Sequence, residues 1–532
     1  MELFFNNAGP CIPGDHYMID PLRRIDHETV EDLIAEKRYF VLHAPRQTGK
    51  TSCLLALMHH LNDQGRYQAL YVNVEAAQAH REDIPEAMRT ICYSIADNAE
   101  DYLQDTRLTP SIEALLQRGT GKALQALLRH WASINEKPVV LFIDEIDALI
   151  GDTLVSVLRQ IRAGYAQRPH KFPLSIVLCG VRDVRDYRME PRHKEVITGG
   201  SAFNIKAVSL RLGSFSQAEV RELWAQHTAA TGQIFAEAIY PALWADTQGQ
   251  PWLVNALGYQ LTRSPEFRYL RDRTIPITLK DYQTAREILI QSRATHLDQL
   301  SDKLKEPRVH AVISALLSGT QTDKTIPLDN LNYVEDLGLI QRHPVLSIAN
   351  RIYQEVIPRD LTYTTQYMLP YQQAWYLTLQ RRLDIPKLLK AFQHYFQEHS
   401  EAWIERFDYK EAGPQLLLQA FLQRIVNGGG RITREYGLGR RRTDLYIEWP
   451  IDEQAGYHGE VQRIVLELKI RYQSKQATIE KGLAQTADYA DKSAADEAHL
   501  LIFDRRPEVA WQEKIWCQTA QHGAREITMW GL

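Results

Sequence analysis

The first part of the chain alternates between short apolar runs and longer amphipathic stretches. Largely apolar runs occupy residues 39–43, 68–75, 138–143 and 173–181. Helical periodicity of apolar residues fills the intervals 27–37, 50–62, 84–99, 111–134 and 152–166. Continuously apolar strands are typical of a parallel sheet that is covered on both faces. We therefore predict an α/β domain with a doubly wound parallel sheet over residues 1–211, with 205–210 as its last strand.

After residue 212 the pattern predicts mainly helices. Ser216 and Glu219 have the spacing of a capping box before a helix over 217–228, and Pro251 lies where a helix start tolerates proline. We predict a helical lid over 212–300 and a helical connector over 361–404. Between them, residues 301–360 contain two helical stretches, 307–318 and 328–336, and then two short apolar runs that read as a hairpin. That order is the outline of a winged helix.

The C-terminal part predicts a second α/β domain over 405–532. An amphipathic helix over 415–426 ends at three glycines, residues 428–430. Strand patterns follow at 431–436, 440–447, 461–470 and 499–504, and a helix before the last of these carries Gln485 and Tyr489. The fold class is therefore α/β throughout, with the lid and the winged helix between two separate sheets.

Charge and cysteine content limit the possible binding partners and the cellular compartment. The 532 residues carry a net charge of −4, from 62 basic and 66 acidic side chains, so no overall field attracts nucleic acid and any such binding must be local. The five cysteines are scattered and lack the paired spacing of a zinc site, which favours a reducing compartment. No apolar run is long enough to span a membrane, and the N-terminus has no basic segment of a signal peptide. We expect a cytoplasmic protein with no membrane partner.

Residues 44–51 lie between the first predicted strand and a helix, and they have the composition of a phosphate-binding loop. A helix start presents unpaired amide N–H groups and the positive end of its dipole to an anion. Lys50 would reach the β- and γ-phosphates, and the Thr51 hydroxyl would bind Mg²⁺. The usual first glycine of such a loop is Ala44, so a chance match is the alternative. The other predicted nucleotide contacts are Gln47, Thr48, Gly49 and Ser52.

A second acidic motif supports this interpretation. The apolar run 139–143 ends in Asp144 and Glu145. Asp144 could hold Mg²⁺ through water, and Glu145 could polarise an attacking water molecule. With both motifs in a strand–loop–helix context, the sequence predicts an ATPase with ATP and Mg²⁺ as cofactors.

These motifs resemble those of the bacterial and archaeal AAA-like ATPases, relatives of the STAND switch NTPases and of the origin-recognition ATPases. The resemblance rests on 43–51, 142–147 and 249–251 and covers residues 5–360. Alanine at the first loop position is usual in that family. The resemblance implies that Pro251 packs near the adenine and that Arg182 senses the γ-phosphate. A surface arginine is the alternative for Arg182. The winged helix would close on the nucleotide, as in switch proteins, or bind DNA; we favour the first role.

Within the run 461–470, Glu467 and Lys469 are two residues apart, so they share one face of the predicted strand. A charged pair in a buried strand is costly unless it is paired or binds a metal. Asp444, on the preceding strand, would bring a second carboxylate to the same face. Two carboxylates hold Mg²⁺, and a lysine can orient water or neutralise developing charge. The alternative is a structural Glu–Lys pair with Asp444 exposed.

This region resembles the PD-(D/E)XK nuclease superfamily, in particular nuclease domains fused to AAA-like ATPases. The resemblance covers 405–525 and rests on residues 427–430, 434–440, 444–445, 467–469, Gln485 and Tyr489. It implies that Asp444 and Glu467 bind the metal, that Lys469 is catalytic and that Gln485 assists. The early-helix glutamate of the family has no clear match, because that helix offers Gln415, Gln419 and Gln423; Glu435 is a candidate further acid. Nearby basic residues could contact a phosphate backbone: Arg431, Arg434, Arg440, Arg441, Arg442, Arg463, Arg471 and Lys475.

The sequence thus predicts an ATP-driven switch that controls a metal-dependent nuclease. We expect Mg²⁺ or Mn²⁺ at the second site, a nucleic acid substrate with DNA favoured over RNA, and a homo-oligomer on activation. Defence against foreign nucleic acid would suit such a fusion. One alternative is a nucleotide-dependent binding switch in which the second domain only docks nucleic acid or a partner. A DNA-loading ATPase of the origin-recognition type is a third interpretation.

Overall fold

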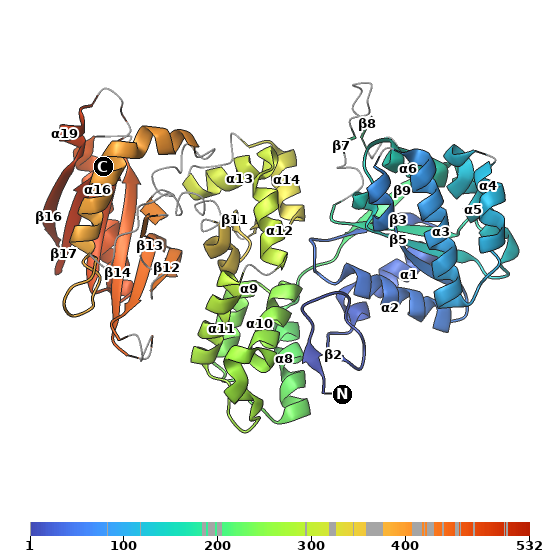
Figure 1. The fold of residues 1–532 in the computed structure, drawn as a ribbon, viewed down its shortest axis with the longest axis horizontal. Helices are drawn as coiled ribbons and strands as arrows, with labels where there is room; N and C mark the ends of the chain where they lie inside the picture. Colours follow the sequence, from blue (N-terminus) through green and yellow to red (C-terminus); the bar gives the residue numbers. More distant parts are fainter. Residues whose placement is uncertain are drawn as a thin grey trace. The chain divides into compact units, whose positions relative to one another are not determined.

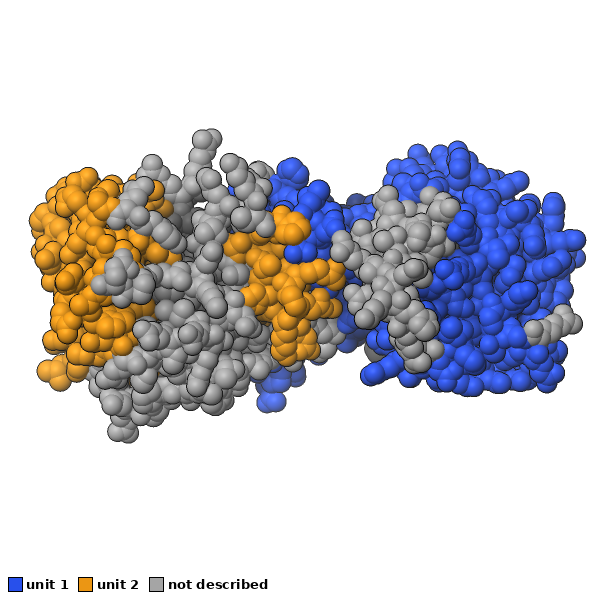
Figure 2. Space-filling view, turned by 90° about the horizontal axis from the view of Figure 1, so that it is seen from above, with its two compact units in different colours: residues 1–296, 328–350 blue, residues 297–327, 351–532 orange. Residues whose placement is uncertain are grey.

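The computed structural model divides the chain into two compact units, which Figure 2 colours separately. Unit 1 comprises Met1–His296 and Leu328–Asn350, and unit 2 comprises Leu297–Pro327 and Arg351–Leu532. The two stretches of the predicted 301–360 segment thus fall into different units. The structure describes residues 2–532 except 82, 118, 183–187, 190–196, 199–204, 293–294, 319–325, 344, 358–375, 407–417, 420, 423–429, 439–440, 453–456, 458, 472–473, 505 and 507–508.

The described residues of unit 1 form a five-stranded sheet in which every neighbouring pair of strands is parallel (Figure 1). The strand order is β4-β5-β6-β3-β9. The strands are β3 (Tyr39–His43), β4 (Gln68–Asn73), β5 (Val139–Asp144), β6 (Ser175–Gly180) and β9 (Lys206–Arg211). The prediction of a doubly wound parallel sheet is confirmed for this part of the chain.

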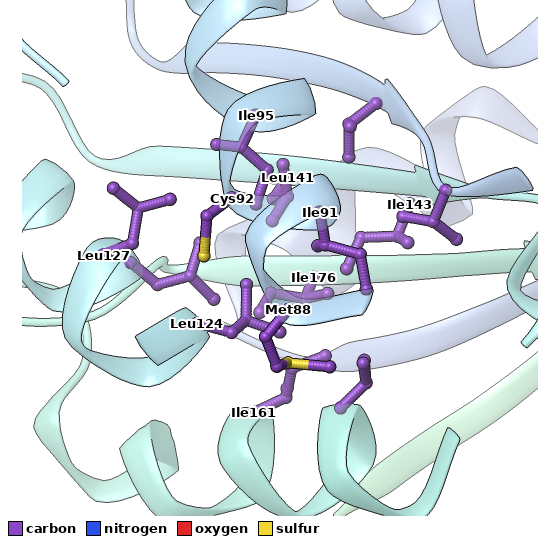
Figure 3. Close-up of a cluster of buried hydrophobic side chains, with 14 of the residues drawn as sticks. Met88, Ile91, Cys92, Ile95, Leu124, Leu127, Leu141, Ile143, Ile161 and Ile176 are labelled. Atoms are coloured by element: carbon purple, nitrogen blue, oxygen red, sulfur yellow. The ribbon is translucent and has the colours of Figure 1, made fainter. Parts of the chain in front are cut away.

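Helices cover both faces of this sheet because the strands bury both sets of alternate side chains. On β5, Val139, Leu141 and Ile143 face one core. Val140 and Phe142 face the other. The first core contains side chains from α3 (Ile84–Leu103), α5 (Ala123–Ile134) and α6 (Gly151–Gly164), and Figure 3 shows its centre. The second contains side chains from α1 (His27–Ala35) and α2 (Lys50–Asp63).

Local signals fix most of the helix starts. The Asp26 carboxylate accepts the Thr29 amide at the start of α1. The single helix predicted over 111–134 is wrong, because the structure has α4 (Ile112–Gln117) and α5 with Gly119 at a φ of +118° between them. A glycine in that conformation interrupts helical hydrogen bonding. Two short strands, β7 (Arg188–Met189) and β8 (Ile197–Thr198), form a separate antiparallel pair.

A helical lid follows the sheet in unit 1. The capping box predicted at Ser216 and Glu219 is present at the start of α8 (Gln217–Thr231). The lid continues with α9 (Ile239–Thr247), α10 (Pro251–Arg263) and α11 (Leu279–Gln291). The N-terminal pair β1 (Phe4–Phe5) and β2 (His16–Tyr17), which the sequence did not indicate, packs on this lid, with the Phe5 ring 5.9 Å from the Trp224 ring.

Unit 1 also contains α14 (Leu328–Asp336) and the antiparallel hairpin of β10 (Ile340–Gln341) and β11 (Ser347–Ile348). These elements match the second half of the predicted winged helix. The preceding helices α12 (Thr295–Leu304) and α13 (Pro307–Ser318) lie wholly or mainly in unit 2.

The described part of unit 2 has a six-stranded mixed sheet in the order β12-β13-β14-β15-β17-β16 (Figure 1). The first three strands are antiparallel, and β15 runs parallel to β14. α18 (Lys475–Lys492) connects β14 to β15, and α16 (Ile385–Arg406) precedes the sheet. The strands are β12 (Arg431–Leu438), β13 (Arg441–Pro450), β14 (Val461–Ile470), β15 (Glu497–Phe503), β16 (Trp516–His522) and β17 (Arg525–Gly531).

The C-terminal region contains one element that the sequence did not predict, and one predicted helix there can be checked only in part. The final hairpin of β16 and β17, which follows the short α19 (Trp511–Lys514), was not predicted. Most of the helix predicted over 415–426 lies outside the described residues. Within that range the structure describes residues 418–419 and 421–422, and these are helical. None of the helices in the described part of the chain is both long and apolar enough to cross a membrane.

Candidate nucleotide site and a second acidic site

The phosphate loop lies between the carboxyl end of β3 and the first residue of α2. Gly49 precedes that helix with a φ of +89°, a conformation that favours glycine. A Cβ on Gly49 would lie 2.8 Å from Nη1 of Arg24, at the end of a long side chain that could shift. The backbone conformation is therefore the reason that this position favours glycine.

Lys50 is the first residue of α2, and its side chain turns back over the loop. Its Nζ donates hydrogen bonds to the carbonyl oxygens of Ala44 and Pro45, both at 3.1 Å, and the residue is 5% exposed. A buried ammonium needs such acceptors. Phosphate oxygens would offer this cation charged acceptors in place of the two neutral ones.

Thr51 connects the loop to the acidic strand. Its Oγ1 donates to Oδ2 of Asp144 at 2.7 Å. Asp144 is fully buried at the end of β5, and its Oδ1 accepts the backbone N–H of Glu145 at 2.9 Å. A hydroxyl and a carboxylate at the start of a phosphate-binding helix are hard oxygen donors, which fit Mg²⁺. This fit supports Thr51 and Asp144 as the residues that would hold the ion.

Glu145 follows Asp144 in a left-handed backbone conformation, with a φ of +56°. Burial raises the pKa of its carboxyl group, and the neighbouring charge of Asp147 raises it further. Asp147 itself accepts the Val181 amide at 3.2 Å. A carboxylate with a raised pKa next to a metal-binding residue is suited to take a proton from water.

Three more of the predicted contacts lie in this loop region. The Thr48 hydroxyl donates to the Pro45 carbonyl at 2.8 Å, and its own carbonyl accepts from Arg24. Ser52 accepts the Cys11 amide through its Oγ at 3.2 Å. Gln47 has a φ of +56°, and its carbonyl accepts from Gln250 at 3.5 Å. Pro251, the residue after Gln250, is buried at the first position of α10.

Arg182 follows β6 at the same edge of the sheet. Its guanidinium lies over the ring of Tyr333 of α14, 4.6 Å from the ring centroid. The segment that contains Tyr333 also contacts the ends of two other strands. Arg211 donates a hydrogen bond to the Glu335 carbonyl at 2.9 Å, and His43 lies 3.9 Å from the Asp336 carboxylate. A Cβ on Gly338 would be 2.8 Å from Pro45. Residues 333–338 therefore rest on the carboxyl edge of the sheet beside the phosphate loop.

Sequence analysis missed several residues of this site. Tyr71 donates to Asp144 at 3.1 Å, and Arg24 and Tyr333 touch the loop or the predicted sensor. Each comes from an element distant in sequence and has no motif of its own. An apolar strand that contains a tyrosine two residues before its end was the one available signal for Tyr71.

The second acidic site lies on β13 and β14. The paired register of these antiparallel strands runs as far as Leu445 opposite Leu466, and its continuation by one residue would set Asp444 opposite Glu467. Glu467 is 2% exposed and forms an ion pair with Lys469 at 2.5 Å. The side chains of Asp444 and Glu435 lie outside the described part of the structure.

Gln485 lies on α18, which packs against β14. Its Oε1 is buried and has no hydrogen-bond partner among the described residues. The described side chains include no cluster of three or more histidine, cysteine or acidic residues placed to hold a metal. Several of the basic residues have partners: Arg431 pairs with Glu355 at 3.8 Å, Arg471 with Asp504 at 2.9 Å, and Lys475 lies 3.9 Å from the Trp516 ring.

Comparisons with known proteins concern the first site. Residues 34–187 match the family described as AAA domain. No curated protein matches the chain.

Similar solved structures include a Walker-type ATPase, PABY2304 of Pyrococcus abyssi, with 14% identity and a TM-score of 0.47 over 66% of this chain and 99% of that one. The ORC2 protein of Aeropyrum pernix has 14% identity and a TM-score of 0.36, over 65% and 96%. The RuvB Holliday junction branch migration motor of Thermotoga maritima has 13% identity and a TM-score of 0.33, over 64% and 98%.

The family match covers β3, the phosphate loop, β5 with its two carboxylates, and β6. Residues 34–187 of this chain form an AAA-type P-loop ATPase domain.

Proposed function

We propose that the chain is an ATP-binding and ATP-hydrolysing switch. The observation that carries this proposal is the 2.7 Å hydrogen bond between Thr51 and Asp144, beside the buried Lys50 ammonium. It joins the phosphate loop to the acidic strand at one point. A bound Mg²⁺ would supply charge stabilisation for the phosphates at that point.

The chain's own residues then have separate tasks. Lys50 exchanges its two carbonyl acceptors for phosphate oxygens, and the amides at the start of α2 bind the same anion. Glu145, whose pKa is raised by burial, accepts a proton from the attacking water at its carboxylate. Gln250, next to Pro251, connects the helical lid to the loop through the Gln47 carbonyl.

Residues 333–338 supply the switching contact. Arg182 cannot both stack on Tyr333 and turn to a γ-phosphate, so the nucleotide and Tyr333 compete for one guanidinium. A triphosphate would favour release of Tyr333, and a diphosphate would leave the stacked pair intact. This competition gives the switch a physical basis: differential affinity for two arrangements of one segment.

We further propose that residues 405–532 act as a metal-dependent nuclease controlled by this switch. Support comes from a strand register that, continued by one residue, would set Asp444 opposite Glu467, and from the buried Glu467 with Lys469. The Gln485 oxygen on the neighbouring helix, which has no partner among the described residues, adds to this support. Two carboxylates would hold Mg²⁺ or Mn²⁺, and Lys469 would neutralise charge on the scissile phosphate. DNA is the favoured substrate, and assembly into a homo-oligomer would accompany activation.

The direct Glu467–Lys469 ion pair favours a second candidate function, a binding module without catalysis. In that case the pair is structural, and the domain docks nucleic acid or a partner. Metal binding separates the two functions, since catalysis requires it and docking does not.

The ATPase proposal is tested with Lys50→Ala and Glu145→Gln. Lys50→Ala should abolish ATP binding, and Glu145→Gln should bind ATP but lower its hydrolysis at least about 100-fold, since it lacks the base. Calorimetric binding of ATP and phosphate release measure the two effects. Unchanged hydrolysis in Glu145→Gln would refute its assigned role.

The nuclease proposal is tested with Glu467→Gln, with Glu497→Gln as the matched control. Glu497 belongs to the same sheet but bonds Gln462, at the other end of β14. With ATP and Mg²⁺ or Mn²⁺, Glu467→Gln should lose DNA cleavage by at least about 100-fold and keep ATP hydrolysis, because it removes a metal ligand. Glu497→Gln should keep both. If the parent protein binds DNA and cuts neither DNA nor RNA, the docking function is correct.

A further inference from the structure

We propose that Tyr71 is a positioning residue of the ATPase site, which orients the Asp144 carboxylate toward the metal that Thr51 and Asp144 would hold. The Tyr71 hydroxyl donates to Oδ2 of Asp144 at 3.1 Å, the same oxygen that accepts from Thr51 at 2.7 Å. The inference rests on the proposed ATP-binding function and assigns to that site a residue from a strand outside both motifs.

The fold fixes the place of this hydroxyl. Tyr71 lies on β4, the edge strand next to β5, where Asn73 pairs with Asp144. The residue is 7% exposed and belongs to the second core of the sheet. Its ring meets Tyr102 edge-on at 6.4 Å. A ring buried in this core and in contact with Tyr102 leaves its hydroxyl little freedom.

The hydrogen bonds around Asp144 then divide between its two oxygens. Oδ1 accepts the Glu145 amide, and Oδ2 accepts two hydroxyls, from Thr51 and Tyr71. Rotation of the carboxylate would break all three bonds together. Donors that are fixed in place and that hold a ligating carboxylate set its direction and strengthen metal binding.

The chemical type of the donor also matters. A tyrosine hydroxyl is a neutral hydrogen-bond donor. A lysine or arginine in its place would neutralise Asp144 and compete with a metal ion. A neutral donor leaves the full negative charge for the cation.

A purely structural role is the alternative, because a buried hydroxyl needs some acceptor in any case. Tyr39 provides the comparison within the same sheet. It is fully buried, and its hydroxyl donates to the Pro173 carbonyl at 3.0 Å, away from both motifs. Tyr39→Phe therefore removes a similar buried hydrogen bond without touching Asp144.

The experiment measures ADP binding by titration calorimetry for the parent, Tyr71→Phe and Tyr39→Phe, once with Mg²⁺ and once with EDTA. We expect similar affinities of all three proteins in EDTA. The gain in ADP affinity from Mg²⁺ should be roughly 10-fold smaller in Tyr71→Phe than in the parent. A loss of this size is typical when a side chain that binds a metal loses a hydrogen bond. Tyr39→Phe should keep the full gain.

Equal gains from Mg²⁺ in Tyr71→Phe and Tyr39→Phe would overturn the proposal. An equal loss in EDTA and in Mg²⁺ would also overturn it, since Tyr71 would then act on the loop and not on the metal. If the parent protein binds no ADP under either condition, the proposed ATPase function itself fails, and that result is distinct from the other two.

Discussion

At the scale of single residues, two adjacent carboxylates have different surroundings. Asp144 is fully buried and accepts hydrogen bonds from two hydroxyls and an amide. Burial and the nearby charge of Asp147 both raise the pKa of the Glu145 carboxyl group. Environments that differ in this way separate the role of metal ligand from that of proton acceptor.

The pH dependence of hydrolysis should report the pKa of Glu145. Only the deprotonated form accepts a proton, so kcat should fall as the pH drops through a pKa that lies above the ordinary glutamate value. Asp147→Asn removes a like charge, lowers that pKa and should move the acidic limb to lower pH. Asp152→Asn, which changes the same charge on α6, is the control and should leave the limb in place. A limb that does not move in Asp147→Asn would exclude Glu145 as the titrating base.

Sequence motifs foretold part of the site at this scale. Lys50 and Thr51 are recognisable because the phosphate loop is contiguous, and Asp144 because it ends an apolar strand. The sequence did not predict Tyr71 and Tyr333 as site residues, because their contacts depend on strand order and on the packing of α14. Glu467 and Lys469 needed only the alternation of strand side chains, and their ion pair agrees with that spacing. The part of Asp444 in this site stays a prediction.

At the scale of elements, the turn before α10 joins the lid to the sheet domain. Gly249 has a φ of +70°, and a Cβ there would lie 1.9 Å from the Phe215 carbonyl oxygen. The Phe215 amide also donates to the Gly249 carbonyl at 2.8 Å. The turn therefore combines a left-handed conformation with a close backbone approach.

Gly249→Ala should destabilise this turn more than an ordinary glycine substitution does. We expect a loss of at least about 2 kcal/mol, from backbone strain and from the clash together. Gly232→Ala at the end of α8 is the matched control: its φ is +77° but no atom lies within 4 Å, so it should cost about 1 kcal/mol. Urea unfolding followed by tryptophan fluorescence measures both. Similar losses in the two variants would contradict the steric argument.

The ends of β14 and β15 in unit 2 share one carboxylate. Hydrogen bonds from Arg506, followed by the charges of Arg506 and Arg471, lower the pKa of Asp504 to about 2. The stabilisation that ionised Asp504 gives to the folded state is therefore complete above the unfolded-state pKa of about 3.8. It is lost as the pH falls toward 2.

Asp504→Asn should remove about 2 kcal/mol of local stability at pH 7 and abolish the acid sensitivity that this group causes. Hydrogen exchange at 497–503, measured between pH 7 and pH 3, reports the effect. Asp488→Asn breaks an exposed pair with Lys492 and should cost at most about 0.5 kcal/mol. Equal protection in the parent and in Asp504→Asn at pH 7 would refute the assignment.

Element prediction succeeded where apolar residues were continuous and failed where the signal was a weak alternation. β5 is apolar up to its last residue and β14 has a continuous apolar centre at 464–466, and the sequence located both. The hairpin of β16 and β17 was missed, because β16 is largely exposed and polar. Its turn at Gly523, with a φ of +63°, was the available signal. The break near Gly119 was missed because amphipathic periodicity continues on both sides of it.

At the scale of the whole molecule, the proposed switch would connect the nucleotide state to the rest of the chain through residues 333–338. Tyr333→Ala removes the ring under Arg182, which should free the guanidinium for a γ-phosphate. Because a stacked cation at a partly exposed site contributes roughly 1 kcal/mol, we expect about a 3- to 5-fold tighter binding of ATP relative to ADP.

Leu328→Ala is the control for that variant, since Leu328 lies on the same helix and is 63% exposed. Competition of ATP and ADP for a fluorescent nucleotide analogue measures the ratio. Under the proposed switch, Tyr333→Ala should also reduce the ATP dependence of DNA cleavage. An ATP-to-ADP preference equal to that of the parent would show that Tyr333 does not restrain Arg182.

The interleaved division of the chain has a consequence for biosynthesis. Unit 1 needs residues 328–350, which leave the ribosome only after 297–327 of the other unit have been made. The ATPase therefore cannot complete its fold during translation until the chain has passed residue 350. A nascent chain released before residue 333 would lack the whole segment that rests on the phosphate loop, so premature termination there would yield a protein without these contacts.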